Sequence, residues 1–153
     1  MRNKRLLIVE QLDKKIEPFL ATTTTPVPNR GWINAIRVGL NMTLAQLGAK
    51  LNITRQGAKR IEESETKGTI SINSLKEVAA ALDLKLVYGF VPIDGSLNNL
   101  IEKKANVLAQ KIVLRTHHNM QLEDQGISDD KVKQSIRELA NEMKREMRRS
   151  LWD

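Results

Sequence analysis

Apolar residues recur at helical spacing over most of the chain. In residues 4–20 they lie three or four positions apart with Lys and Glu between them, which predicts an amphipathic helix. The same spacing predicts helices over 97–115 and 129–150, separated by a loop at 124–126. Residues 21–29 predict a linker, because their four Thr and two Pro disfavour helical geometry.

The stretch over residues 30–92 is denser in helix signals. An apolar stripe ends near Gly39, and three short helices follow it, the first two over 44–51 and 55–65. A hydroxyl or amide side chain is available to cap the start of each of these three helices. The candidate caps are Thr43, Thr54 and either Ser71 or Asn73.

Residues 84–91 come after the last of these helices and have a different pattern. They alternate in part, are rich in aromatic and β-branched residues and end before Pro92, which predicts a short strand. A lone strand leaves its backbone groups unpaired, so we expect it to pair with its symmetry mate in a homodimer. The helices over 97–115 and 129–150 are further candidate dimer elements.

Together these elements predict an all-α protein with one short β-strand and helical extensions at both ends. The predicted divisions are an N-terminal amphipathic helix, a linker, a central domain and a C-terminal helical region for dimer or partner contacts. Their ranges are 1–20, 21–29, 30–92 and 93–153.

Positive charge is concentrated in the first part of the chain. The formal charge of the whole is +7, but residues 1–60 alone hold eleven basic and three acidic side chains, a charge of +8. Residues 61–100 carry −3 and residues 101–153 carry +2. Such a distribution favours an anionic partner of the first 60 residues, although solvated lysines are the alternative explanation.

Composition excludes several classes of site. The chain has no Cys, which excludes a disulfide scaffold, a thiolate metal site and a cysteine nucleophile. His117 and His118 are adjacent and lack metal-ligand spacing, so we expect no metal and no cofactor. The carboxylates Glu62, Glu63 and Glu65 lie near a helix end, where solvated and ion-paired roles are favoured over acid–base catalysis.

Two further absences shape the expectation. We find no nucleophile–base pair and no phosphate-binding loop, and so expect no enzyme. No apolar run approaches the roughly 18 residues of a membrane-spanning helix, so we expect a cytoplasmic protein that does not bind membranes.

The helices over 44–51 and 55–65 are separated by a tight turn, which is the arrangement of a DNA-reading helix–turn–helix. Arg55, Gln56 and Arg60 share the outer face at the start of the second helix. Arg can bond guanine through two hydrogen bonds and Gln can do the same for adenine, so we expect these three to contact bases. A purely structural helical hairpin is the alternative.

The segment GLNMTLAQLGAKLNITRQGAKRIE, residues 39–62, resembles the phage-repressor/Cro helix–turn–helix family of Xre-type regulators. The resemblance implies a repressor-like core of five helices over about 30–84. It assigns the base contacts to Arg55, Gln56 and Arg60. Phosphate contacts are implied at Thr43, Leu44 (through its N–H) and Thr54, and a structural ion pair at Arg37 and Glu62. Charge adds Lys59 and Lys67 as phosphate contacts. Asn52 and Ser64 depart from the glycines that are common in the family.

A narrower resemblance covers nearly the whole chain. The peptides GWI at 31–33, GTI at 68–70, VYGFVP at 87–92 and MQLEDQ at 120–125 together resemble the mobile mystery protein A family. Its members lie beside a Fic-domain protein, which implies a toxin–antitoxin-like module with a Fic-domain partner. The short motif by which many Fic-inhibiting proteins act is not found in this sequence.

We therefore expect a sequence-specific, duplex-DNA-binding transcriptional regulator. It would act as a homodimer on a pseudo-palindromic operator, as an autorepressor and as the antitoxin-like partner of a Fic-domain protein. The alternative is a protein-binding antitoxin that neutralises a toxin directly, with DNA binding secondary. In that case the helix over 4–20 would lie in a groove of the partner.

Overall fold

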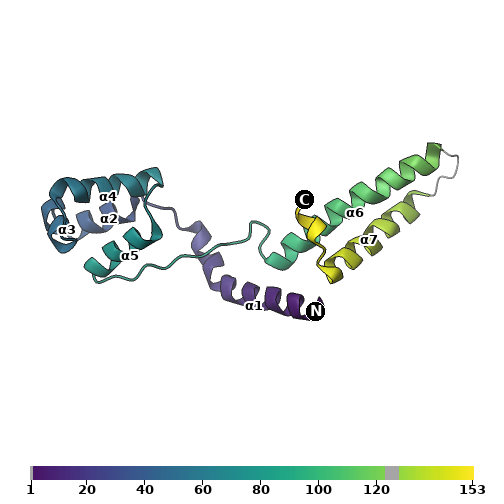
Figure 1. The fold of residues 1–153 in the computed structure, drawn as a ribbon, viewed down its shortest axis with the longest axis horizontal. Coiled ribbons are helices and arrows are strands. Elements are labelled where there is room, and N and C mark those ends of the chain that lie inside the picture. Colours follow the sequence, from purple (N-terminus) through teal and green to yellow (C-terminus); the bar gives the residue numbers. More distant parts are fainter. Residues whose placement is uncertain (1, 123–127) are drawn as a thin grey trace. The chain divides into compact units, whose positions relative to one another are not determined.

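The computed structural model describes residues 2–122 and 128–153, and all regular secondary structure in these ranges is helical (Figure 1). The all-α class is therefore confirmed. The elements are α1 Arg2–Leu20, η1 Ala21–Thr24, α2 Gly31–Gly39, α3 Leu44–Lys50, α4 Arg55–Lys67, α5 Ile72–Ala81, α6 Leu97–Leu122, α7 Asp129–Glu146 and η2 Arg149–Trp152. The loop predicted at 124–126 and part of the peptide MQLEDQ lie outside the described residues.

The chain divides into two compact units. One is Thr24–Tyr88, which holds α2 to α5, and the other consists of the described residues of Met1–Thr23 and Gly89–Asp153. Each unit has a hydrophobic core of its own. We call them the central unit and the flanking unit.

The central unit packs four helices around a small core. The buried members come from all four helices and the residue after α5, and they are Ile33, Leu47, Ala58, Val78 and Leu82. The fifth helix expected within residues 30–84 is absent from this described range. After α5 the backbone turns through the left-handed conformation at Asp83 (φ 57°), and the β-branched and Gly-containing sequence that follows does not favour a helix.

The strand expected over residues 84–91 is also absent from the described chain, and this prediction was wrong for the single protomer. The segment is extended, but no other described segment offers it a backbone edge. A strand is defined by its hydrogen-bonded neighbour, so side-chain pattern alone does not produce one.

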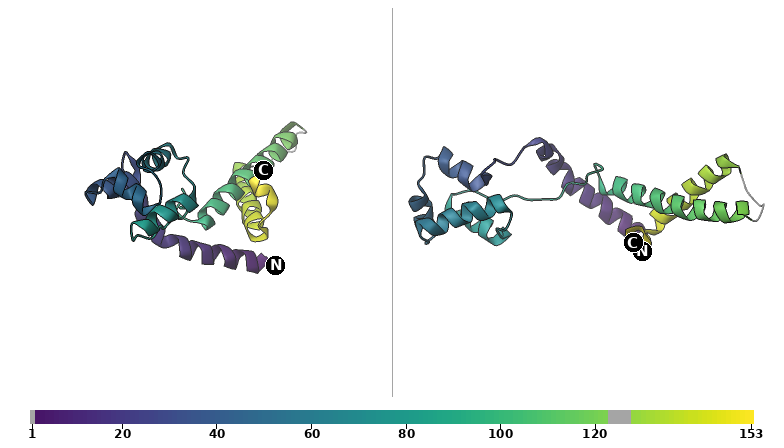
Figure 2. Two further views of the ribbon diagram at one scale, coloured as in Figure 1. Left: turned by 60° about the vertical axis from the view of Figure 1, so that its left-hand side comes forward. Right: turned by 90° about the horizontal axis from the view of Figure 1, so that it is seen from above.

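The flanking unit is built on a hairpin of α6 and α7, which lie side by side in every view (Figure 2). Small residues on α6, Ala105 and Ala109, are fully buried and let α7 approach closely, with Met143 filling the contact. Helix α6 continues seven residues beyond the predicted end at 115. Helix α7 ends earlier than predicted, because Met147 adopts a left-handed conformation (φ 50°) that terminates it.

Helix α1 packs on this hairpin, and Asp13 fixes the contact. The Asp13 carboxylate accepts hydrogen bonds from the backbone N–H groups of Leu97 (2.7 Å) and Asn98 (3.2 Å), at the start of α6. A carboxylate at a helix N-terminus satisfies free amide donors and complements the helix dipole. Val9 adds an apolar contact to the hairpin core. The helix predicted over 4–20 therefore has a place within its own chain.

Candidate nucleic-acid interface

The start of α3 is fixed by a reciprocal pair of hydrogen bonds. The Thr43 hydroxyl accepts from the backbone N–H of Gln46 (3.1 Å), and the Gln46 side chain accepts from the backbone N–H of Thr43 (2.8 Å). This capping box satisfies two amide donors that the helix itself cannot pair. The predicted cap at Thr43 is correct, and it sets the direction in which α3 leaves the preceding loop.

The turn between α3 and α4 is held against Gly48. Asn52 takes the left-handed conformation (φ 57°), and the Ile53 N–H donates to the Gly48 carbonyl (2.9 Å). A Cβ atom at Gly48 would lie 2.8 Å from the Ile53 carbonyl oxygen and 2.9 Å from that of Thr54. Only glycine therefore allows this approach, and Asn52 supplies the turn where the family commonly has Gly.

Helix α4 begins at the predicted position. The Thr54 hydroxyl accepts from the Gly57 N–H (3.0 Å), and Ala58 is completely buried against the core. A Cβ atom at Gly57 would approach the Ile53 side chain to 3.3 Å, so this glycine also serves internal packing. Because Ala58 faces the core, the opposite side of the first two turns of α4 faces outward, and polar side chains occupy it.

That outer arc consists of Arg55, Gln56, Lys59 and Arg60, which we call the reading face. All four side chains are exposed. Among the described residues none of them forms a hydrogen bond or an ion pair with another side chain. Three cations and one amide thus project from one end of a fixed helix, and no side chain in the described ranges pairs with them.

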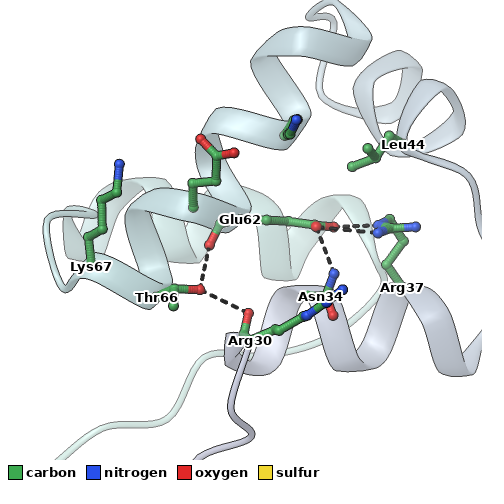
Figure 3. A pocket seen from close by; sticks show the side chains of 9 residues that line it. Arg30, Asn34, Arg37, Leu44, Glu62, Thr66 and Lys67 are labelled. Carbon is green, nitrogen blue, oxygen red and sulfur yellow. Dashed lines mark hydrogen bonds and ion pairs between the residues drawn. The ribbon is translucent and has the colours of Figure 1, made fainter.

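The far side of α4 is fastened to α2 by a buried carboxylate, that of Glu62 (Figure 3). Glu62 forms an ion pair with Arg37 and accepts a hydrogen bond from the Asn34 amide (2.9 Å). Arg37 also donates to the Met42 carbonyl (2.8 Å), in the loop before α3. Arg37 therefore joins α2, α4 and the entry to α3, and Asn34 is a member of this network that sequence reasoning missed.

A second carboxylate, Glu65, caps α2 from α4. It accepts from the backbone N–H groups of Trp32 (2.7 Å) and Ile33 (2.9 Å), and Gly31 (φ 86°) turns the chain so that this approach is possible. Sequence reasoning treated Glu65 as one of a solvated cluster, because the contact spans more than thirty residues. The available signal was the absence of a capping side chain at Arg30.

Three of the predicted phosphate-contact residues border one groove, of about 390 Å³, beside the Glu62 network (Figure 3). They are Leu44, Lys59 and Lys67, and Arg30 lies on the same rim. Thr43 and Thr54 do not line this groove; they are exposed at the starts of α3 and α4. Helix α4 runs past the predicted end at 65 and stops at Gly68 (φ 74°), so Lys67 lies in its last turn.

The described residues contain no group of three or more His, Asp or Glu side chains arranged to hold a metal ion. In the same residues we find no helix with the length and apolar character needed to cross a membrane.

Comparison with known proteins gives one family match. Residues 33–88 match the family described as Helix-turn-helix, and the matched range includes none of the helices of the flanking unit. No curated protein and no solved structure gives a significant match. The matched residues span α2 to α5, with the capped pair α3 and α4 at their centre. Residues 33–88 are therefore an Xre-type helix–turn–helix domain, the class of domain found in DNA-binding transcriptional regulators.

Proposed function

We propose that the protein is a sequence-specific regulator that binds duplex DNA through the reading face of α4. Two features of α4 together carry the proposal. Its exposed face presents Arg55, Gln56 and Arg60 without partners among the described side chains. Its opposite face is fixed by contacts with the rest of the central unit. The Glu62 network and the buried Ala58 fix the orientation of α4 without using any side chain of the reading face.

Base contacts follow from the donors that these side chains present. The Arg guanidinium matches the two acceptors of guanine in the major groove, and the Gln amide matches the donor and acceptor of adenine. Arg55 and Gln56 are the first two residues of α4, the end of a recognition helix that commonly contacts base edges. Arg60 lies about one turn further along the same arc.

Phosphate contacts would fix the position of the domain on the duplex. Lys59 and Lys67 are exposed and lie on the outer side of α4, and the hydroxyl groups of Thr43 and Thr54 keep a donor after accepting their capping bonds. The N–H of Leu44 forms no hydrogen bond among the described residues. These groups would supply most of the affinity for any duplex, and the base contacts of the reading face would supply the preference for one sequence.

We propose further that two copies bind a pseudo-palindromic operator upstream of their own gene and repress it. One recognition helix covers only a few base pairs, and a two-fold pair of helices about 34 Å apart doubles the sequence that is read.

An anisotropy titration tests this function. The labelled duplexes are DNA from upstream of the gene and a scrambled duplex of equal composition, each at two salt concentrations. We expect tighter binding to the first duplex and a steep loss of affinity with salt, because phosphate contacts release counterions. Equal, weak binding to both duplexes would mean that the protein binds DNA only by non-specific electrostatic attraction, and it would contradict the proposal.

Two double variants localise the effect. Arg55→Ala/Gln56→Ala removes the predicted base contacts and should reduce binding of the specific duplex to the scrambled level. Arg115→Ala/Gln110→Ala removes the same residue types from exposed positions on α6 and should leave the preference unchanged. Equal losses in both variants would mean that the reading face has no special role.

A second role, as a protein-binding antitoxin, is favoured by the surface of α1. Leu7, Ile8 and Leu12 are 41–52% exposed although α1 packs on the α6–α7 hairpin. The resemblance to the mobile mystery protein A family implies that this partner is a Fic-domain protein. Ile8→Glu/Leu12→Glu should then abolish co-purification with that protein while DNA binding persists. Undiminished co-purification would remove α1 from the proposed contact.

A further inference from the structure

Residues 84–88 leave the central unit as an extended segment with an open backbone edge. The N–H of Leu84 donates to the Ala79 carbonyl (2.7 Å), but within the described residues no hydrogen bond is made by the backbone N–H groups of residues 85–91. Extended geometry with free donors and acceptors is the form in which a strand accepts another strand.

The side chains of this segment are divided by parity. Even positions hold Leu84, Leu86, Tyr88 and Phe90, which are all large and apolar, whereas odd positions hold Lys85, Val87 and Gly89. Leu84 and Leu86 line an apolar groove of the central unit, as Lys85 and Val87 also do, and Leu84 is still 45% exposed. Tyr88 and Phe90 are 58% and 87% exposed. The first half of the apolar face is therefore partly covered among the described residues, whereas the second half is exposed.

This apolar groove, of about 400 Å³, lies alongside the first half. It is formed by α2, α5 and the segment itself, and its walls include Trp32, Ile36, Leu75, Leu82 and Leu86. Trp32 remains 47% exposed on its rim, and Val87 is 67% exposed beside it. The groove thus ends at the same open backbone edge.

We propose that a second copy of the chain covers this edge and groove, through an antiparallel ribbon of residues 84–90 from both copies centred on Val87. In this register Leu86 lies opposite Tyr88 and Leu84 opposite Phe90. The exposed aromatic half of each segment then lies beside the groove-lining half of the other. This inference rests on the proposed function, because it names the contact that joins two reading faces.

The geometry favours a second copy over other occupants. A small apolar ligand would fill the groove but pair none of the backbone donors of residues 85–90, whereas an identical antiparallel segment pairs the N–H groups on the facing edge of each segment, which are those of alternate residues. Charge is compatible with this register, since Lys85 lies opposite Gly89 and the two Lys85 side chains are about 13 Å apart along the ribbon.

Disulfide trapping tests the register in a chain that contains no Cys. Val87→Cys places two thiols directly opposite each other at the two-fold axis, and mild oxidation should convert most of the protein to a covalent dimer. Lys85→Cys introduces a thiol at another exposed position two residues away and should cross-link at least tenfold more slowly. Equal rates for the two variants would overturn the inference.

A proline variant tests the backbone contact. Val87→Pro/Tyr88→Pro removes two consecutive N–H groups, of which one must point toward the paired strand. Neither donor is used among the described residues 2–122 and 128–153, so circular dichroism and the melting temperature should be unchanged. Light scattering should change from a dimer to the 17.3 kDa monomer. A variant that stays dimeric would show that another surface joins the copies.

The two proposals fail in different ways. A wild-type protein that is monomeric at micromolar concentration but binds a single half-site specifically would overturn the inference and leave the proposed function intact. A protein that cross-links through Val87→Cys but has no preference for any duplex would overturn the proposed function alone.

Discussion

At the scale of single residues, the sequence predicts which side chains α4 exposes, but it does not predict the polar contacts that join α4 to α2. Arg55, Gln56 and Arg60 could be assigned to an outer arc because the helical period fixes which positions point away from Ala58. Asn34 and Glu65 could not be assigned, because each finds its partner about thirty residues away in the sequence. Long-range polar contacts depend on how the helices pack.

Two cations on the reading face are expected to act differently. Arg55→Ala should cost about 1–3 kcal/mol of binding free energy and relax preference at one base pair, since a bidentate base contact is lost. Lys59→Ala should weaken all duplexes alike and lower the salt slope by about one, as a phosphate contact does. Titration against single-base operator variants separates these results, and identical profiles for both variants would refute the assignment.

Gly48 should be intolerant of a side chain. Gly48→Ala pushes a methyl group against two backbone carbonyls of the turn, so we expect a loss of about 1–3 kcal/mol in unfolding free energy. Gly39→Ala is the matched control, because a Cβ atom there meets nothing within 4 Å. Chemical denaturation measures both variants. Equal stability of the two would mean that the turn moves without cost.

At the scale of elements, local signals determined where helices begin, and tertiary partners determined the rest. Thr43 and Thr54 cap α3 and α4 as predicted, and of the two candidates Ser71 and Asn73 it is Ser71 that caps α5. These starts could be predicted because a capping bond involves residues only three apart. The strand over 84–91 required a neighbouring edge, which no other segment in the described part of the chain provides. The fifth helix expected in the core came from the family resemblance and has no counterpart in the described sequence that follows α5.

The contact between α2 and α4 should depend on the buried pair. Glu62→Ala leaves the Arg37 guanidinium without its carboxylate in a half-buried position, and we expect about 3–5 kcal/mol of destabilisation. Glu63→Ala removes the neighbouring but exposed carboxylate and should change stability by less than about 0.5 kcal/mol. Urea unfolding of both variants checks this, and a small effect of Glu62→Ala would show that Met42 and water compensate Arg37.

At the scale of the molecule, two separate cores imply separable functions. Every residue of the proposed DNA interface lies in the central unit, from Thr43 to Lys67. Residues 84–88 of the open edge belong to the same unit, and the last two residues of the proposed ribbon, 89 and 90, belong to the flanking unit. The flanking unit has its own core and the exposed apolar residues of α1. We infer that DNA reading and the contact with a second copy belong mainly to the central unit, and that contact with a different protein belongs to the flanking unit.

A fragment of residues 24–92 should therefore fold and keep the sequence preference of the full chain. Its core draws only on residues of the fragment, so we expect a helical spectrum and one cooperative melting transition. The salt slope of DNA binding should also be unchanged, because all proposed phosphate contacts are retained. The matched control is the same fragment with Arg55→Ala/Gln56→Ala, which should fold equally well and lose the preference. A fragment that folds but shows no preference would place part of the reading surface in the flanking unit.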